Sequence, residues 1–146
     1  FLKKKDEGIL PITDIRMTRF MITLEEGVKL VWHAFEDMLG GEIYVKKIPS
    51  MSVVDLATAL APECKLEFVG VRPGEKLHEI LVNEYEMQRV TDTPDYYTVH
   101  PEYRPVSGLT PKPLGEEFTS LNTHQLQAGV AIDSMLEAMG NQETYH

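Results

Sequence analysis

Apolar residues recur at helical spacing between residues 24 and 39, and this is the clearest pattern in the chain. Thr23 and Glu26 form a capping box in front of it, because the threonine hydroxyl can accept an amide while the glutamate reaches back. Gly40 and Gly41 are typical of a helix end. The pattern predicts a helix over residues 24–39 with these positions on its apolar face: Leu24, Val28, Val31, Phe35, and Met38 or Leu39.

Other segments are rich in β-branched and aromatic residues or alternate apolar with polar ones. Ser52 and Asp55 predict the start of a second helix, which ends before Pro62. Strands are predicted over residues 12–22, 42–46, 65–71, 77–82 and 95–99.

The last third of the chain has a different character. Residues 100–114 contain four prolines and predict an irregular loop. Asn122 is the candidate cap of a last helix, which has Gly129 inside it. Strand and helix alternate through residues 12–71, so we predict an α/β fold, with α+β packing as the alternative arrangement.

The helix of residues 24–39 is more apolar than one buried face requires. Leu30, Trp32 and Ala34 widen its apolar stripe. Such a helix usually packs against neighbours on more than one side. In a lone small domain it would leave apolar surface in water, so we expect the chain expressed alone to be prone to aggregation.

Composition and charge narrow the possible partners. The chain has 146 residues, a length that fits one domain, and 42% of them are hydrophobic, as in globular proteins. Its net charge of 14 − 23 = −9 and the lack of a basic stripe argue against nucleic acid and against a membrane. Cys64 is the only cysteine, which suits a cytoplasmic protein. The chain starts at Phe1 without Met, so we expect it to be part of a longer protein.

Common motifs for metals and nucleotide phosphates do not occur. The five histidines have no ligand spacing, so we predict no metal site. The sequence contains no Gly-x-Gly-x-x-Gly, Walker or Gly-x-Ser-x-Gly motif.

The stretch of residues 72–79 follows directly on an apolar strand end, where α/β proteins place ligand contacts. Pro73 and Gly74 fix a turn that presents Arg72 and Glu75 on one edge. A guanidinium suits phosphate oxygens, and a carboxylate can accept hydrogen bonds from sugar hydroxyls. The pair is either half of a nucleotide-sugar clamp or an Arg–Glu pair on an ordinary turn.

A second cluster contains Arg16 and Arg19 in an extended segment. Residues three apart in a strand point to opposite faces, so only one of them can face a given ligand. Arg19 lies between Thr18 and Phe20 and needs an anionic partner. A ligand, Asp14 or a glutamate could each supply that anion.

Three segments together resemble the C-terminal part of the polysaccharide-biosynthesis extended short-chain dehydrogenase/reductases. They read PITDIRMTRFMITLEEGV, GEIYVKKIPSMSVVDLATALAPE and VGVRPGEKLHEILV. Within this family they are most similar to the inverting UDP-N-acetylglucosamine 4,6-dehydratases of the pseudaminic-acid (flagellin glycan) pathway. The resemblance covers about residues 9–100.

This resemblance implies a site divided between two halves of a protein. The N-terminal Rossmann half of the family binds NADP and carries a Tyr-x-x-x-Lys catalytic pair, while the C-terminal part binds the UDP moiety. By the same motifs, Arg19 and Arg72 would hold the diphosphate and Glu75 the ribose. Met17 and Thr18 would lie beside the substrate, UDP-N-acetylglucosamine.

The chain departs from the family in ways that set its limits. It has neither a Tyr-x-x-x-Lys pair nor a dinucleotide loop, so we expect no catalytic and no cofactor-binding residue in it and little activity from it alone. Residues 1–103 would be the substrate-binding region, in which 24–46 pack on a Rossmann sheet that is absent. Residues 104–146 would be a Pro-rich loop and a helix, and the parent protein a homo-oligomer.

Three alternatives stay open at this point. A UDP-N-acetylglucosamine 4-epimerase and the retaining dehydratase of the same family share RPGEK-like motifs. A non-catalytic nucleotide-sugar-binding or assembly module would keep the clamp without the reaction. A protein-interaction domain that uses the apolar helix would not bind UDP.

Overall fold

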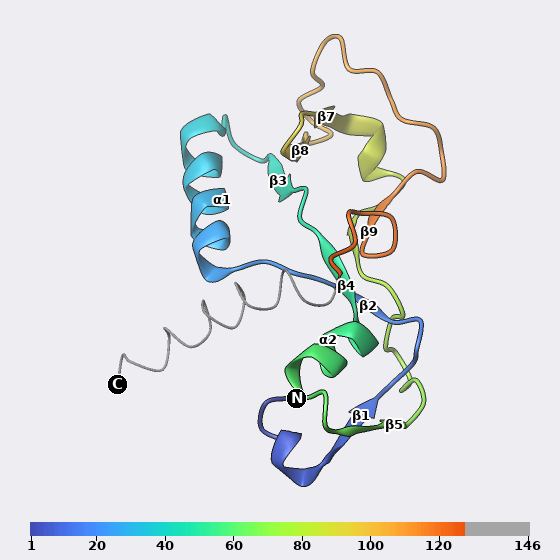
Figure 1. The fold of residues 1–146 in the computed structure, drawn as a ribbon. Helices are drawn as coiled ribbons and strands as arrows, with labels where there is room; N and C mark the ends of the chain where they lie inside the picture. Colours follow the sequence, from blue (N-terminus) through green and yellow to red (C-terminus); the bar gives the residue numbers. More distant parts are fainter. Residues whose placement is uncertain (128–146) are drawn as a thin grey trace.

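The computed structural model describes residues 1–127. Short strands pair across long stretches of sequence, and the two α-helices lie against different sheets (Figure 1). The elements are η1 Lys5–Glu7, β1 Ile9–Ile12, β2 Thr18–Phe20, α1 Leu24–Asp37, β3 Ile43–Lys46, β4 Ser50–Ser52, α2 Val53–Leu60, β5 Lys65–Phe68, β6 Ile80–Val82, η2 Glu86–Arg89, β7 Val90–Asp92, β8 Tyr96–Val99 and β9 Phe118–Thr119.

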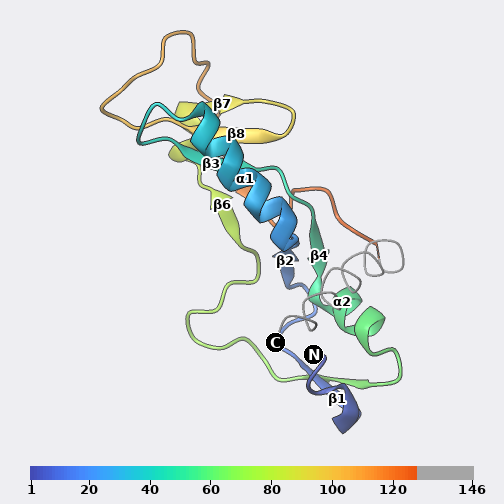
Figure 2. The same cartoon turned by 90° about the vertical axis from the view of Figure 1, so that its left-hand side faces the viewer.

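Two small apolar cores lie at opposite ends of the molecule. One is formed around the antiparallel sheet β3–β8–β7 and the pair β6–β9, with Val82, Met87 and Phe118 buried in it. The other lies where α2 covers the parallel pair β1–β5, around Leu10 and Ile12. The antiparallel pair β2–β4 connects the two ends (Figures 1 and 2). These pairings confirm the mixture of helix and strand that the sequence predicts.

Two of the three predicted helix starts are confirmed by their caps. The Thr23 hydroxyl accepts the Glu26 amide at 3.2 Å, and the Glu26 carboxylate accepts the Thr23 amide at the same distance. Ser52 Oγ accepts the amides of Val54 and Asp55. The first helix ends at Asp37, two residues short of the prediction, because Met38 already has extended backbone angles.

The predicted strand over residues 12–22 is wrong as a single element: only Thr18–Phe20 within it forms β2, Ile12 is the last residue of β1, and a turn separates the two strands. Asp14 closes that turn by accepting the Arg16 amide on its side chain and the Met17 amide on its carbonyl oxygen. The strand predicted over 65–71 ends at Phe68, where its partner β1 also ends. Likewise, only Ile80–Val82 of the segment 77–82 is a strand.

Asn122 does not begin a helix, contrary to the prediction. Its side-chain oxygen accepts the Thr119 amide at 2.9 Å and closes a turn that follows β9. Residues 123–127 continue as an irregular segment, in which Gln125 bridges to Ser50. The remainder of the predicted helix lies outside the described residues.

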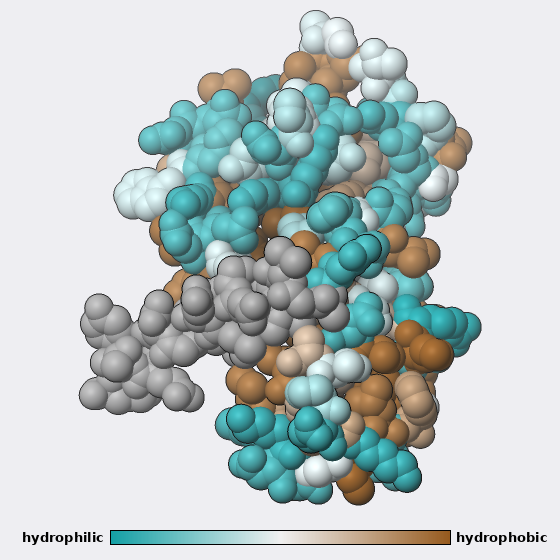
Figure 3. Space-filling view, in the orientation of Figure 1, coloured by the Kyte–Doolittle hydropathy of each residue, from teal (hydrophilic) through white to brown (hydrophobic). Residues whose placement is uncertain are grey.

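Apolar side chains on α1 stay exposed. The helix lies along the β3–β8–β7 sheet (Figure 2), where His33 stacks on Tyr96 with ring centroids 4.2 Å apart. On its other side, Trp32 and Phe35 are 64% and 68% exposed. Only one side of the helix therefore has a neighbour within residues 1–127. Further hydrophobic surface lies around β1, β5 and α2 (Figure 3), including the exposed Phe68 and Val69.

Candidate functional site

The turn that carries Arg72 and Glu75 is closed on itself. The Glu75 amide donates to the Arg72 carbonyl at 3.0 Å, and the Arg72 amide donates to the Glu75 carboxylate at 3.3 Å. Gly74 has φ 83°, a left-handed conformation that suits glycine. The Glu75 carboxylate also accepts the Thr13 hydroxyl at 3.4 Å. Glu75 therefore joins this turn to the segment that follows β1.

Arg72 is exposed on that turn. Its backbone takes part in closing the turn, but within residues 1–127 its guanidinium has no hydrogen-bond or ion-pair partner. All five donors of this group are available to a ligand.

Arg19 is held in a different way, because its guanidinium is already engaged by the protein. Nη1 donates to the carbonyl oxygens of Thr18 and Leu77 at 2.8 and 3.2 Å, and Nη2 donates to that of Lys76 at 3.1 Å. The carboxylates of Glu75 and Glu79 lie 3.9 and 3.6 Å away. Arg19 therefore ties β2 to residues 75–79, and two of its five donors face carboxylates rather than carbonyls.

Arg16 lies apart from this group. Its guanidinium forms two hydrogen bonds with the Asp14 carboxylate, at 2.9 and 2.8 Å. The hydrogen bond from the Arg16 side chain is the main reason why the pKa of Asp14 falls to about 2. Only Arg19 of this pair meets the 72–79 segment, because Arg16 lies in the turn before β2 and not in the strand that the sequence predicted.

Thr18 and Met17 lie beneath the surface at this site. Both side chains are buried, and the Met17 carbonyl oxygen accepts the Val53 amide at 2.9 Å, which fixes it to the start of α2. The Thr18 hydroxyl lies 2.8 Å from Nδ1 of His78 and 2.7 Å from the hydroxyl of Ser120. In this arrangement they support the site from within the fold.

The structure thus brings together Arg19, Thr18 and Glu75, to which Arg72 is joined through its backbone, and adds four residues that the sequence did not single out. Of these additions, His78 and Glu79 belong to the RPGEKLHE stretch, so their proximity could have been inferred from the motif. No sequence motif pointed to Thr13 or Ser120, because their contacts are with segments that are distant in sequence. The four additions are Thr13, His78, Glu79 and Ser120.

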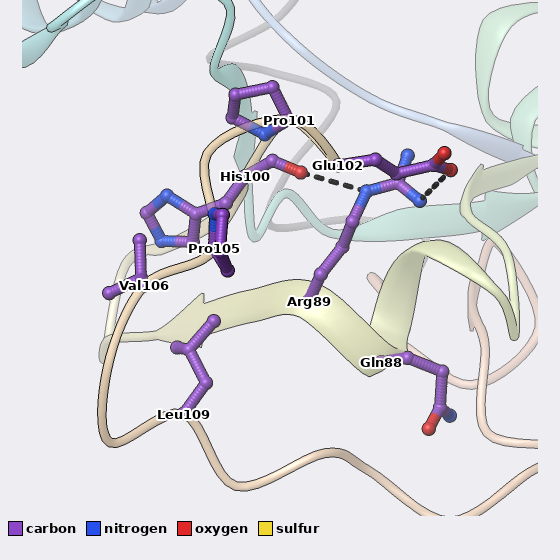
Figure 4. A pocket seen from close by; sticks show the side chains of 8 residues that line it. All are labelled: Gln88, Arg89, His100, Pro101, Glu102, Pro105, Val106 and Leu109. Carbon is purple, nitrogen blue, oxygen red and sulfur yellow. Dashed lines mark hydrogen bonds and ion pairs between the residues drawn. The ribbon is translucent and has the colours of Figure 1, made fainter.

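A separate cavity of about 340 Å³ lies between η2–β7 and the Pro-rich loop (Figure 4). Arg89 points across it, donating from Nε to the His100 carbonyl at 2.8 Å and from Nη1 to Glu102 at 3.1 Å. The Arg89 guanidinium therefore holds the Pro-rich loop against η2. The exposed Tyr103 lies on the same loop.

The helix starts do not suit a dinucleotide. A dinucleotide phosphate binds to free amides at a helix N-terminus that follows a glycine-rich loop. Neither α1 nor α2 follows a glycine-rich loop, and their caps occupy the Glu26 amide in α1 and the Val54 and Asp55 amides in α2. The described residues therefore offer no helix start of the kind that binds a dinucleotide phosphate. They also contain no group of three His, Cys, Asp or Glu side chains that could hold a metal, and no helix among them could cross a membrane.

Comparisons with known proteins indicate the same family as the RMTRF and RPGEKLHE motifs. The model of the family described as polysaccharide biosynthesis protein matches residues 1–101. The chain is 49% identical over 106 residues to a UDP-N-acetylglucosamine 4,6-dehydratase (inverting) of Campylobacter jejuni, covering 71% of this chain and 32% of that protein. It is 36% identical over 138 residues to a UDP-glucose 4-epimerase of Rickettsia conorii, covering 86% of this chain and 40% of the epimerase.

A solved structure shows the same fold. The X-ray structure of Pen from Bacillus thuringiensis superimposes with a TM-score of 0.76 at 24% identity, covering 94% of this chain and 43% of that one. It supports the α/β fold class. The chain spans about a third of the length of the Campylobacter relatives. The family resemblance carried by RMTRF and RPGEKLHE is confirmed, and the chain belongs to the polysaccharide biosynthesis protein family.

Proposed function

We propose that this chain is the C-terminal, UDP-sugar-binding part of an NADP-dependent UDP-N-acetylglucosamine 4,6-dehydratase that inverts C5. The observation that carries the proposal is the junction of the two motifs, in which Arg19 binds the carbonyl oxygens of Lys76 and Leu77. In this proposal the guanidinium of Arg72 and the carboxylate of Glu75 meet the ligand at the edge next to this junction, and the closed turn of residues 72–75 supports it. The Campylobacter relative, a UDP-N-acetylglucosamine 4,6-dehydratase (inverting), supports the choice of reaction.

Each residue of the edge has a different task in this proposal. Arg72 supplies unoccupied donors for the diphosphate, so that a net-negative chain can hold an anionic ligand locally. Glu75, held by its own turn, accepts hydrogen bonds from the ribose hydroxyls. Arg19 fixes the edge and turns its remaining donors to the diphosphate when Glu75 turns to the ribose. Binding energy far from the reacting carbon then orients the hexose.

The cofactor belongs to a part outside this chain. NADP would supply a hydride acceptor next to the sugar, and the described residues offer no helix start of the kind that binds its phosphates. We propose that a Rossmann half precedes the chain and packs against residues 24–46, where the apolar side of α1 is exposed. The share of the relatives' length that the chain covers, about a third, supports this proposal.

The wider setting follows from the same resemblance. We propose a cytoplasmic homo-oligomer that acts in bacterial surface or flagellin glycan biosynthesis, in the pseudaminic-acid pathway. Neither nucleic acid nor a membrane is a partner in this proposal, and the acidic composition supports that.

Replacing Arg72 by Ala in the full-length protein tests the clamp. Loss of a charge-assisted hydrogen bond costs about 1.5–3 kcal/mol, so KM for UDP-N-acetylglucosamine should rise about tenfold or more, with the larger part of the effect in KM. Arg16→Ala is the matched control, because it removes one positive charge from a neighbouring turn. It should change KM less than about twofold. An unchanged KM with reduced turnover in Arg72→Ala would show that the assigned role is wrong.

A UDP-sugar 4-epimerase is the second candidate, because the match to the Rickettsia epimerase extends over more of the chain. Product analysis of the full-length protein separates the candidates. A 4-keto-6-deoxy product with inverted C5 supports our proposal, and the same product with retained C5 indicates the retaining dehydratase. A C4 epimer indicates the epimerase, and UDP binding without turnover indicates a non-catalytic module.

A further inference from the structure

Ser120 lies outside residues 1–101, yet it is in contact with both motifs. It is 0% exposed. Its hydroxyl oxygen accepts the Glu79 amide at 2.9 Å and lies 3.2 Å from the carbonyl oxygen of Thr18. Its own amide donates to the Glu79 carbonyl at 2.8 Å. One buried side chain thus joins the RMTRF strand to the end of RPGEKLHE.

Counting protons assigns a direction to these contacts. Ser120 and Thr18 have one hydroxyl proton each. If Ser120 donates to the Thr18 carbonyl, the 2.7 Å contact between the two hydroxyls requires Thr18 to donate to Ser120. Thr18 Oγ1 can then accept only from Nδ1 of His78, at 2.8 Å. With this assignment, each contact in the network has one donor and one acceptor, and Nδ1 of His78 is a donor.

The chain of bonds ends at the proposed clamp. The Thr18 carbonyl oxygen accepts from Arg19 Nη1 as well as from Ser120. On the other side, Glu79 is fixed to Ser120 through its backbone, while its carboxylate lies 3.6 Å from Arg19 Nε. Ser120 therefore restrains the two segments between which Arg19 is held.

The segment around Ser120 has attachments that do not need its hydroxyl. The Ser50 hydroxyl donates to the Ser120 carbonyl oxygen, and the Ser50 amide donates to the His124 carbonyl at 2.9 Å. The Leu126 amide returns to the Ser50 carbonyl at 2.8 Å. Removing the Ser120 hydroxyl should therefore loosen the clamp without releasing the segment.

We infer that Ser120 is a positioning residue of the nucleotide-sugar site, acting through Thr18 and Glu79, so that the segment of residues 118–126 is part of that site. This inference rests on the proposed function. It assigns a role to a region beyond the family match, and it gives His78 a place as a donor in the same network.

The test is calorimetric binding of UDP to the full-length protein, together with steady-state kinetics. Ser120→Ala should weaken UDP binding about tenfold, equivalent to about 1.4 kcal/mol, and raise KM more than it lowers kcat. Ser107→Ala, in the exposed Pro-rich loop, is the matched control and should bind as the wild type does. A folded Ser120→Ala protein with unchanged UDP affinity overturns the inference. Wild-type protein that does not bind UDP overturns the proposed function itself.

A second pair of variants covers the case in which Ser120→Ala does not fold. Thr18→Val keeps the shape of the side chain and removes the hydroxyl, whereas Thr18→Ser keeps the hydroxyl. We expect Thr18→Ser to bind UDP more tightly than Thr18→Val. Equal affinities would overturn the inference, because they would show that the hydroxyl network does not act on the site.

Discussion

The interior around Thr18 and the outer face of α1 differ in how many of their side chains find a partner within the described residues. Around Thr18, segments from four parts of the sequence meet, and every buried polar side-chain atom within residues 1–127 has a hydrogen-bond partner. On α1, large apolar side chains such as Trp32 and Phe35 lie in the open. Within residues 1–127, the first region has all its partners and the second does not.

This difference indicates which parts of the chain form their contacts internally and which need a partner. Buried hydroxyls without partners are costly, so a complete network indicates that residues 18, 78 and 120 fold as one unit. Exposed apolar stripes are costly as well, and large ones mark interaction surfaces. We therefore expect the clamp to keep its geometry within this chain, and α1 to need a partner.

Substitutions on α1 should have the largest effect. In the full-length protein, Phe35→Asp should lower the free energy of unfolding by about 2–4 kcal/mol, because it places an unpaired carboxylate in an apolar contact. In the chain expressed alone, the same change should reduce self-association. Chemical denaturation and light scattering measure the two effects.

The control for this experiment is Leu114→Asp, on an exposed apolar residue outside α1. It should change the unfolding free energy by less than about 0.5 kcal/mol. If the unaltered chain alone is monomeric and unfolds cooperatively on heating, α1 does not need a partner and the contrast between the two regions disappears.

The two arginines give the next largest effect. Arg19→Ala removes three hydrogen bonds, those to the carbonyl oxygens of Thr18, Lys76 and Leu77, so it should lower the unfolding free energy by about 1.5–3 kcal/mol. Arg72→Ala should change it by less than about 0.5 kcal/mol, because the side chain is exposed.

Thermal unfolding of both variants in the full-length protein measures this difference. Arg19→Lys should recover only part of the loss, since an ammonium group cannot reproduce the forked geometry. Equal melting temperatures for Arg19→Ala and Arg72→Ala would contradict the structural role of Arg19.

The smallest effect concerns the turn that leads into β2. The pKa of Asp14 is lowered from its ordinary 3.8 to about 2, mainly by the side-chain hydrogen bond from Arg16. A depressed folded-state pKa means that this contribution to stability is present above about pH 4 and is lost as the pH falls through about 2. NMR titration of the Asp14 carboxyl carbon should show this midpoint.

Arg16→Ala should return that midpoint toward 3.8. A variant that still titrates near 2 would show that backbone hydrogen bonding, rather than the guanidinium, sets the pKa. The turn at Asp14 would then keep its conformation without the ion pair to Arg16.

Local rules located α1 and α2 well, failed for the predicted helix start at Asn122, and located the strands less well. Thr23 and Ser52 act on amides two or three residues away, so their sequence neighbours are enough to place the helix starts. Strand limits depend on a partner: β5 ends at Phe68 because β1 ends at Ile12. Strands β4 and β9 carry few residues each, and their partners β2 and β6 lie far away in sequence.

By itself, the sequence determined the helix caps, the turn at Pro73–Gly74, the family, and the presence of two arginine-bearing motifs. Each depends on residues that are close together along the chain. The tertiary structure decided that Arg19 is bound by backbone carbonyls while the Arg72 guanidinium has no partner within residues 1–127, and that Ser120 joins the two motifs. Those facts depend on which segments, distant in sequence, come together in the fold. A hydrogen bond requires its two atoms to lie about 3 Å apart, and the local sequence around each atom does not determine that distance.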